Sequence, residues 1–294
     1  MTFDIGDGVD SAVNYILDNF APLLDLIAAA IGTVTDLIQT ALLAMPLAAG
    51  LAIFVLLSLW RIGFGFAVFT ALSLMLVDHM GLWSAMMETL SLVIASTLVA
   101  MLVGLPLGIA MARNSRVAAF VRPVLDLMQT MPAFVYLIPA AMFFGLGAVP
   151  GTIATVIFAM PPVVRLTNLG IRQVHVEFIE AGNAFGCTAW QLLMKVQLPN
   201  ALPSIMAGIN QTIMLSLSMV VIASMIGAGG IGNTVLTGIQ RLDVGTGFEG
   251  GLAVVILAVI LDRITQSFGK ERSNPFGFLM RRPARQPEAA PVTA

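Results

Sequence analysis

The sequence predicts an all-α membrane protein, a polytopic helical bundle of about seven transmembrane helices. Hydrophobic residues make up 58% of the 294 residues and charged residues only 10%, whereas a soluble domain carries about 25% charged residues. Seven apolar stretches come near the ~20 residues that cross a bilayer core. Basic residues gather in alternate loops between these stretches. Together these observations favour a chain that places most of its surface against lipid.

The basic residues predict the direction of the spans. Cytoplasmic loops of membrane proteins carry an excess of Lys and Arg. All 14 basic residues except Arg241 fall on one side when the stretches are counted as seven spans. The N-terminus is therefore predicted to lie outside and the C-terminus in the cytoplasm. The expected spans are 42–60, 62–78, 88–112, 123–146, 150–167, 201–226 and 249–268.

Four segments follow from this pattern. Residues 1–41 form an acidic, amphipathic, extracytoplasmic segment, in which one or two helices lie on the membrane surface or pack on the bundle. Residues 42–87 form an N-terminal transmembrane hairpin, with a single long kinked segment as the alternative. Residues 88–269 form the transmembrane core, with the cytoplasmic loop 168–199 inside it, and residues 270–294 form a basic cytoplasmic tail. The tail is expected to be disordered, and either solvated or in contact with anionic lipid.

The polar loop 168–199 contains a short amphipathic module on the predicted cytoplasmic side. Residues from Glu180 to Gly186 can form about two turns of helix, and Gly186 suits a joint where the chain turns. Thr188 and Gln191 have the spacing of a capping box, which predicts a second short helix. By itself, such a loop could simply link two spans.

The spacing in this loop resembles the cytoplasmic loop of ABC importer permeases, which docks onto the ATP-hydrolysing subunit. A Glu-Ala-small triplet is followed after three residues by Gly, and nine residues later by Val-x-Leu-Pro. Gly182 stands where the family more often has Ala, which lowers helix propensity by about 1 kcal/mol but keeps the residue small. The resemblance assigns docking on the ATPase to Glu180, Ala181, Gly182, Gly186, Trp190, Leu198 and Pro199.

Three further stretches resemble a narrower group, the permease subunits of glycine betaine/proline betaine (quaternary amine) importers. They read QTMPAFVY at 129–136, FAMPPVVR at 158–165, and MAGINQT at 206–212, the last continuing to SMVVIASMIG at 218–227. The resemblance implies a homodimer in the lipid of a bacterial inner membrane, a separate ATPase that binds ATP and Mg, and an extracytoplasmic substrate-binding protein. It implies no cofactor, metal or nucleic acid on this chain.

A second glycine-rich motif follows the sixth predicted span. Gly227, Gly229, Gly230 and Gly232 spell the G-x-G-x-x-G of dinucleotide-binding proteins. That function needs a preceding β-strand, whereas here a membrane helix precedes the motif. We interpret it as a turn at an outer gate. No Walker A sequence occurs in the chain, so ATP hydrolysis is expected in a partner and the chain is not expected to be an enzyme.

Polar residues within the predicted spans are candidates to line a translocation path, because such residues are costly in lipid and usually face a cavity or another helix. Helix-to-helix hydrogen bonding is the alternative for each of them. Proline bends or breaks these helices and frees backbone carbonyls. The candidates are Asp126, Gln129, Thr130 and Pro132 in the fourth span, and Asn210 and Gln211 in the sixth.

The expected function is that of a transmembrane permease subunit in an ATP-driven importer of glycine betaine, choline or proline betaine. A quaternary ammonium ligand favours an aromatic cage, but the three Trp and two Tyr are scattered, so selectivity is expected to reside in the binding protein. The alternatives are an ABC permease for another small solute, such as methionine or a different amino acid, and an ion-driven secondary transporter. An intramembrane enzyme would need a catalytic constellation that two His and one Cys do not supply.

Overall fold

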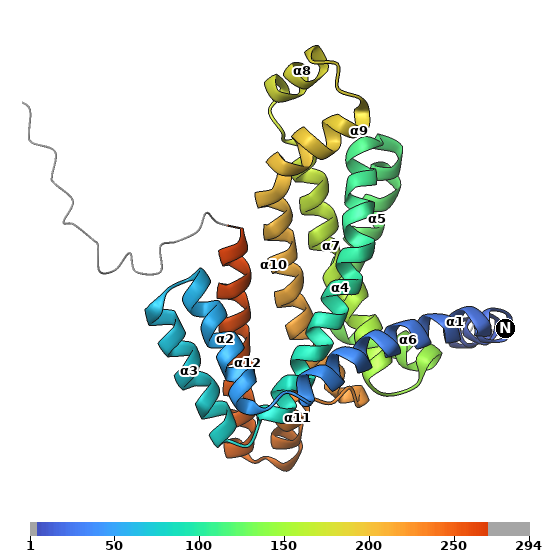
Figure 1. Cartoon of the computed structure of the whole chain (residues 1–294). Helices are drawn as coiled ribbons and strands as arrows, with labels where there is room; N and C mark the ends of the chain where they lie inside the picture. The colour runs from blue at the N-terminus through green and yellow to red at the C-terminus, as the bar shows by residue number, and fades with distance from the viewer. Residues whose placement is uncertain (1–4, 270–294) are drawn as a thin grey trace, which may run out of the picture.

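The computed structural model describes residues 5–269, and every regular element within them is helical (Figure 1). The predicted all-α class is therefore confirmed. A π-helical turn, Leu193–Gln197, and a 3-10 turn, Ser224–Ile226, interrupt the series. The α-helices are α1 (Ile5–Leu43), α2 (Leu47–Arg61), α3 (Phe64–His79), α4 (Trp83–Arg113), α5 (Ser115–Thr130), α6 (Ala133–Phe144), α7 (Ala148–Arg172), α8 (Val176–Ala184), α9 (Ala189–Leu192), α10 (Leu198–Ala223), α11 (Ile231–Arg241) and α12 (Val244–Phe268).

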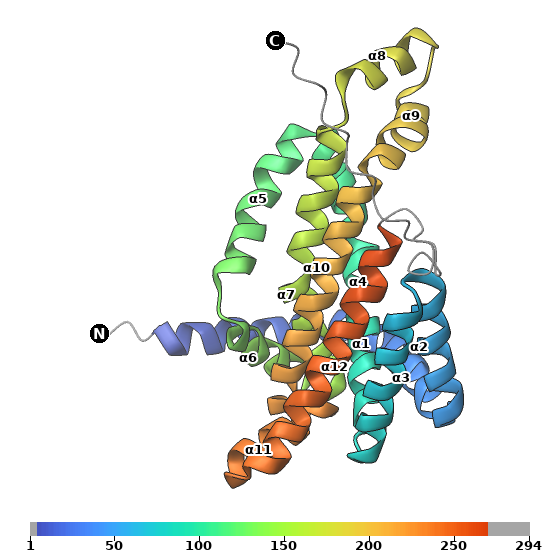
Figure 2. The same ribbon diagram turned by 90° about the vertical axis from the view of Figure 1, so that its left-hand side faces the viewer.

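Helices α4, α7 and α10 stand side by side at the centre of the molecule (Figures 1 and 2). Glycines at their crossings let the backbones approach closely. A Cβ on Gly108 of α4 would lie 2.7 Å from the Thr167 Cβ of α7. A Cβ on Gly170 of α7 would lie 2.7 Å from the Ser204 Cβ of α10. Lipid offers no hydrophobic drive for helix association, so membrane helices rely on such small-residue contacts.

The predicted span 123–146 is not one helix. Helix α5 ends at Thr130, α6 begins at Ala133, and the two axes bend by 102°. Pro132 disfavours the helical conformation of the residue before it. Met131 accordingly has extended backbone angles, φ −74° and ψ 135°.

The structure does not confirm the expected count of seven spans. Within residues 5–269, five helices are long and apolar enough to cross a membrane, or six if α5 and α6 are taken as one broken span. The expected seven included α2 and α3, which have only 15 and 16 residues. Their lengths of roughly 22–24 Å fall short of the ~30 Å hydrocarbon core. The two helices pack on each other and are joined by Ile62 and Gly63.

The first segment forms a single helix, one of the two forms expected. This helix has 39 residues, with Pro22 inside it. Its residues 13–43 are long and apolar enough to cross a membrane. The helix nevertheless lies across the upright central helices in both views (Figures 1 and 2). Its C-terminal part packs on the bundle, where Thr35 is buried and Gly32 faces Val149 of α7.

Basic residues gather toward one end of the bundle. Arg113 and Arg172 end α4 and α7 beside the projecting helices α8 and α9, whereas Arg241 ends α11 at the opposite end (Figure 1). This separation matches the expected sorting of charge between the two sides. The direction of the chain across the membrane stays a prediction, and the predicted basic tail, 270–294, lies outside the described residues.

Candidate functional site

The loop that the sequence singled out forms a projecting helical module, which comprises α8, α9 and the π-helical turn. It extends beyond the ends of α4, α7 and α10 (Figures 1 and 2). Glu180, Ala181 and Gly182 lie in α8. Gly186 joins α8 to α9 with φ +76°, a left-handed conformation that favours glycine.

The capping box predicted for the second short helix is confirmed. The Thr188 Oγ1 accepts a hydrogen bond from the Gln191 backbone N–H at 3.3 Å. The Thr188 backbone N–H donates to the Gln191 Oε1 at 2.9 Å. These bonds satisfy two donors that a helix start otherwise leaves unpaired.

The module does not end at Leu198 and Pro199 as expected. The π-helical turn leads from α9 directly into α10, whose first residues are Leu198 and Pro199. Proline is tolerated there because the first turn of a helix has no internal partner for its N–H groups. The module is therefore continuous with α10, with no loop between them.

Close packing holds α8 against the second half of the module. Gly182 is buried, and a Cβ there would lie 2.7 Å from the Leu192 Cδ1. Leu193 is buried against Ile171 of α7 and Ala201 of α10. A small residue at 182 therefore suits the packing within the chain, where an added Cβ would require the Leu192 side chain to shift.

The outer surface of the module is apolar and exposed. The side chains of Phe185, Trp190 and Phe178 are 90%, 59% and 49% exposed. Glu180 is exposed beside them in α8. Exposed apolar patches rimmed by polar residues are typical of protein interaction sites.

Arg172 anchors the base of the module, a role that sequence reasoning missed. Its Nη2 donates to the Met111 carbonyl oxygen at 2.7 Å, and its Nε donates to the Asn168 Oδ1 at 3.0 Å. The guanidinium thus joins the last turn of α7 to the last turn of α4. A basic residue near a helix C-terminus suits the unpaired carbonyls and partial negative charge there.

The glycine-rich turn lies at the opposite end of the bundle, between α10 and α11 (Figure 1). Gly227, Gly229 and Gly230 all have positive φ, between +76° and +84°. A Cβ on Gly232 would lie 2.8 Å from the Val221 carbonyl oxygen. The glycines therefore serve a tight reversal of the chain, and no strand occurs within residues 5–269 to support the dinucleotide motif.

Two residues of α4 hold the start of α11. The Glu88 Oε2 accepts from the Gly230 backbone N–H at 3.0 Å. The Thr89 Oγ1 accepts from the Ile231 backbone N–H at 2.8 Å. A carboxylate at a helix N-terminus is favoured by the helix dipole. These contacts join positions 142 residues apart, so the local sequence held no signal for them.

The next turn, between α11 and α12, is capped by Asp243. Its Oδ2 accepts from the Thr246 hydroxyl at 2.7 Å, and its Oδ1 accepts from the Gly245 backbone N–H at 3.0 Å. The Thr246 hydroxyl, followed by the backbone amides, holds the pKa of this exposed carboxyl below its usual range. The adjacent Leu242, at φ +53°, is 88% exposed.

The candidate path residues belong to two parts of the chain, α5 with the break after it, and α10. Asp126 is exposed and pairs with Arg165 of α7. Gln129 and Thr130 lie exposed at the end of α5, and Pro132 begins the break before α6. These four residues therefore belong to α5 and the break after it, whereas the other two candidates belong to α10.

The α10 candidates behave differently from each other. Asn210 donates from its Nδ2 to the Asp262 Oδ1 of α12 at 3.0 Å, while Gln211 is exposed. Adjacent residues on a helix point about 100° apart, so the two side chains cannot share one direction. The helix-to-helix hydrogen bond, which was the alternative for any one candidate, is the contact that Asn210 makes.

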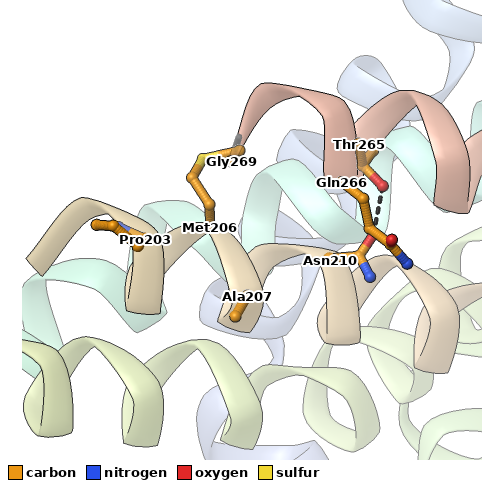
Figure 3. Close-up of a pocket in the computed structure, with 7 residues that line it drawn as sticks. All are labelled: Pro203, Met206, Ala207, Asn210, Thr265, Gln266 and Gly269. Atoms are coloured by element: carbon orange, nitrogen blue, oxygen red, sulfur yellow. Dashed lines mark hydrogen bonds between the residues drawn. The ribbon is translucent and has the colours of Figure 1, made fainter. Parts of the chain in front are cut away.

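A pocket of about 300 Å³ adjoins Asn210, between the first part of α10 and the end of α12 (Figure 3). Sequence reasoning gave no sign of it, because its walls come from helices far apart in the chain. The residues that line it are Pro203, Met206, Ala207, Asn210, Thr265, Gln266 and Gly269.

The bundle of apolar helices, with a short-helix module projecting from one end, fits the membrane subunit of a transporter. The family model for the binding-protein-dependent transport system inner membrane component matches residues 104–273, which include the module. The chain belongs to this family.

Relatives of known function agree with this assignment. The chain is 49% identical over 264 residues to the glycine betaine/proline betaine transport system permease protein ProW of Escherichia coli (strain K12), covering 90% of this chain and 74% of ProW. It is 49% identical to the glycine betaine/carnitine transport permease protein GbuB of Listeria monocytogenes, covering 92% of this chain and 97% of GbuB. It is 48% identical to the glycine betaine transport system permease protein OpuAB of Bacillus subtilis (strain 168), covering 90% and 93%.

Solved structures confirm the fold. An inward-facing structure of the MetNI methionine ABC transporter superposes with a TM-score of 0.57 at 20% identity, covering 62% of this chain and 91% of that chain. The chain is thus an ABC importer permease, a multi-pass protein of the inner membrane, as predicted. It is a transport subunit and not an enzyme, and ATP hydrolysis belongs to a separate subunit. The family also implies an ATPase partner and a substrate-binding protein.

Proposed function

We propose that the chain is the permease of an importer for glycine betaine or a related quaternary amine such as choline or proline betaine. The observation that carries this proposal is the 49% identity to ProW over 90% of the chain. Further support comes from GbuB and OpuAB, whose names also specify glycine betaine. The trimethylamine N-oxide transport system permease protein TmoV of Pelagibacter ubique (strain HTCC1062) is 38% identical, covering 74% of this chain and 30% of TmoV. Glycine betaine, carnitine and trimethylamine N-oxide, which these relatives' names specify, each carry a nitrogen with three methyl groups. Proline betaine, which the name of ProW also specifies, carries a ring nitrogen with two methyl groups.

The module couples this permease to its ATPase. Exposed apolar side chains on α8 and α9, next to Glu180, are the surface that the ATPase contacts. Movement of that surface displaces α10 directly through the π-helical turn. It also displaces α7 and α4 through Arg172. Closure of two ATPase subunits around ATP thereby changes which end of the bundle is open.

The rest of the arrangement follows from this direction of coupling. The module faces the cytoplasm, and the glycine turn at 227–232 lies at the outer end, where it acts as a gate held by Glu88. Two copies of the chain enclose the path, and the exposed faces of α5 and α10 line it. Residues 42–87 stand outside the 104–273 match to the family and form an added hairpin against α12.

The experiment that tests the proposal measures uptake of labelled glycine betaine into proteoliposomes. These contain the chain and its ATPase, with the binding protein added outside and ion gradients collapsed. We expect ATP-dependent uptake, and loss of uptake in Glu180→Arg together with weaker copurification of the ATPase. Glu177→Arg, the same change in the same exposed helix, is the matched control and should keep most of the uptake.

Each alternative gives its own result. ATP-dependent uptake of another solute, such as methionine, without glycine betaine uptake would reject the substrate. Uptake that needs an ion gradient and ignores ATP would reject ATP coupling. Equal loss in Glu177→Arg and Glu180→Arg would reject a specific role for Glu180.

A further inference from the structure

A carboxylate lies inside the last membrane helix, next to the pocket. Asp262 occurs in α12, a helix that is otherwise apolar for most of its length. Its Oδ1 accepts from the Asn210 Nδ2 at 3.0 Å and from the Gln266 Nε2 at 2.6 Å. Ionisable residues within membrane spans are costly and generally mark functional sites.

The orientation of both amides follows from the chemistry of the carboxylate. An ionised carboxylate can only accept hydrogen bonds, so Asn210 and Gln266 must turn their NH₂ groups toward Asp262. The one hydrogen of the Thr265 hydroxyl has two near acceptors, the Asn210 Oδ1 in this cluster and the Leu261 carbonyl oxygen at 2.7 Å in its own helix. The Gln266 Oε1 has no hydrogen-bond partner among the residues that the structure describes.

The polar end of the pocket presents both donors and acceptors, with a carboxylate behind them. Asn210, Thr265 and Gln266 line that end (Figure 3). Each amide gives one N–H to Asp262 and keeps a second, and the Gln266 Oε1 is an acceptor. The partly buried Asp262 carboxylate lies one hydrogen bond behind this wall and supplies negative charge that attracts a cation.

The remaining walls are apolar. Pro203, Met206 and Ala207 of α10 supply ring, thioether and methyl surface (Figure 3). The volume of about 300 Å³ is at the lower limit of the ~300–1,000 Å³ typical of ligand pockets. A small cation that carries methyl groups and has no N–H to satisfy matches both the polar end and these walls.

Two basic residues lie near Asp262 along the chain or across the helices: Arg263, which follows it in α12 and is exposed, and Arg61 of α2. Arg61 donates to the Ser267 carbonyl oxygen, and its guanidinium lies 4.5 Å from the centre of the Phe268 ring. Helix α12 stands between α2 and α10 in both views (Figures 1 and 2). Arg61 thus contacts α12 from the α2 side, whereas the pocket lies on the α10 side.

We propose that this pocket is a binding site for a quaternary ammonium group, with Asp262 supplying the attraction through the amides of Asn210 and Gln266. The inference rests on the proposed function for its physiological ligand, and it places a transient substrate site at the module end of the permease. The same chemistry is offered by a transported solute and by the headgroup of a choline lipid.

Protection of an introduced cysteine tests the site. Ala207→Cys places a thiol in the pocket wall, and Cys187→Ser removes the chain's single natural cysteine. The purified permease–ATPase complex, in nanodiscs of phosphatidylglycerol and without binding protein, is treated with the neutral thiol reagent methyl methanethiosulfonate. Tetramethylammonium, choline or glycine betaine is added at millimolar concentration, with glycine and sodium chloride as controls. Ala119→Cys, exposed on α5, is the matched control position.

We expect the quaternary compounds to slow the reaction at position 207 at least threefold, with no effect at position 119. Asp262→Asn should abolish the protection. If that variant does not assemble, Gln266→Lys, which places a positive charge in the pocket wall, should abolish it as well. No protection at position 207, equal protection at both positions, or protection that survives in both variants would overturn the inference.

Two further measurements distinguish a lipid headgroup from a transported solute, and the pocket site from the proposed uptake of glycine betaine. Slower reaction at position 207 in phosphatidylcholine nanodiscs without added solute, and no protection by added solutes, would overturn the substrate site and assign the pocket to lipid. Protection by tetramethylammonium without glycine betaine uptake would keep the site and reject the proposed substrate. Uptake of glycine betaine without protection would reject the site alone.

Discussion

Replacement of Gly108 by alanine tests whether the central helices are held together by their glycines. The added Cβ would lie 2.7 Å from the Thr167 Cβ and 2.8 Å from the Val164 carbonyl oxygen. Carbon atoms in contact prefer about 3.5–4.0 Å, so α4 and α7 would have to separate by roughly 1 Å. The carbonyl belongs to the α7 backbone and cannot rotate away as a flexible side chain could.

The expected cost follows from this overlap. Overpacking typically costs about 1–3 kcal/mol, and the better helix propensity of alanine offsets about 1 kcal/mol of it. Gly108→Ala should therefore lower the free energy of unfolding by up to about 2 kcal/mol. Equilibrium unfolding in mixed dodecyl maltoside and sodium dodecyl sulfate micelles measures this quantity.

Gly251→Ala provides the matched control. A Cβ at Gly251 of α12 would have no atom within 4 Å, so the same chemical change should be neutral or stabilise by up to about 1 kcal/mol. If Gly108→Ala proved as stable as Gly251→Ala, close approach of α4 and α7 at this glycine would be refuted.

Three further predictions concern the helix ends and the path. Gly230→Ala should lower the melting temperature of the purified complex, because φ is +76° and the new Cβ would lie 2.4 Å from the Thr89 Oγ1; unchanged melting would contradict this geometry. Asp126→Asn should change the free energy of unfolding by less than about 1 kcal/mol, since its pair with Arg165 is exposed. Reduced uptake by this stable variant would support a role for Asp126 in the path, and unchanged uptake would exclude that role. The lowered pKa of Asp243 means that its cap stabilises α12 at and above the usual aspartate pKa and is lost only as pH falls through the lower folded value. Hydrogen exchange at the start of α12, corrected for intrinsic rates, should show this loss in the native chain and not in Asp243→Asn.

Much of the module could be predicted because its determinants are local. The capping box of Thr188 and Gln191 needs only the spacing of two side chains along one helix. Gly186 marks the joint through its own backbone conformation. The continuous path from α9 into α10 could not be predicted, because Leu198-Pro199 is compatible with either a helix end or a first turn.

The path residues were less predictable. Polarity singled out Asn210 and Gln211 equally, but polarity does not indicate which neighbour a side chain meets. Only the packing of α10 on α12 gives Asn210 its partner Asp262 and leaves Gln211 exposed. The same packing forms the pocket, whose walls lie more than fifty residues apart in the chain.

The sequence by itself determined the membrane-embedded helical class, the position of the module and the sorting of charge between the two ends. These properties depend on composition and on spacing within single helices, which any chain with this sequence carries before it folds. The tertiary structure decided the bend between α5 and α6, the placement of α1 across the bundle, and the contacts of Glu88 and Arg172 with other helices. Each of these depends on which helix faces lie against each other, and in a uniformly apolar chain hydropathy does not distinguish one face from another.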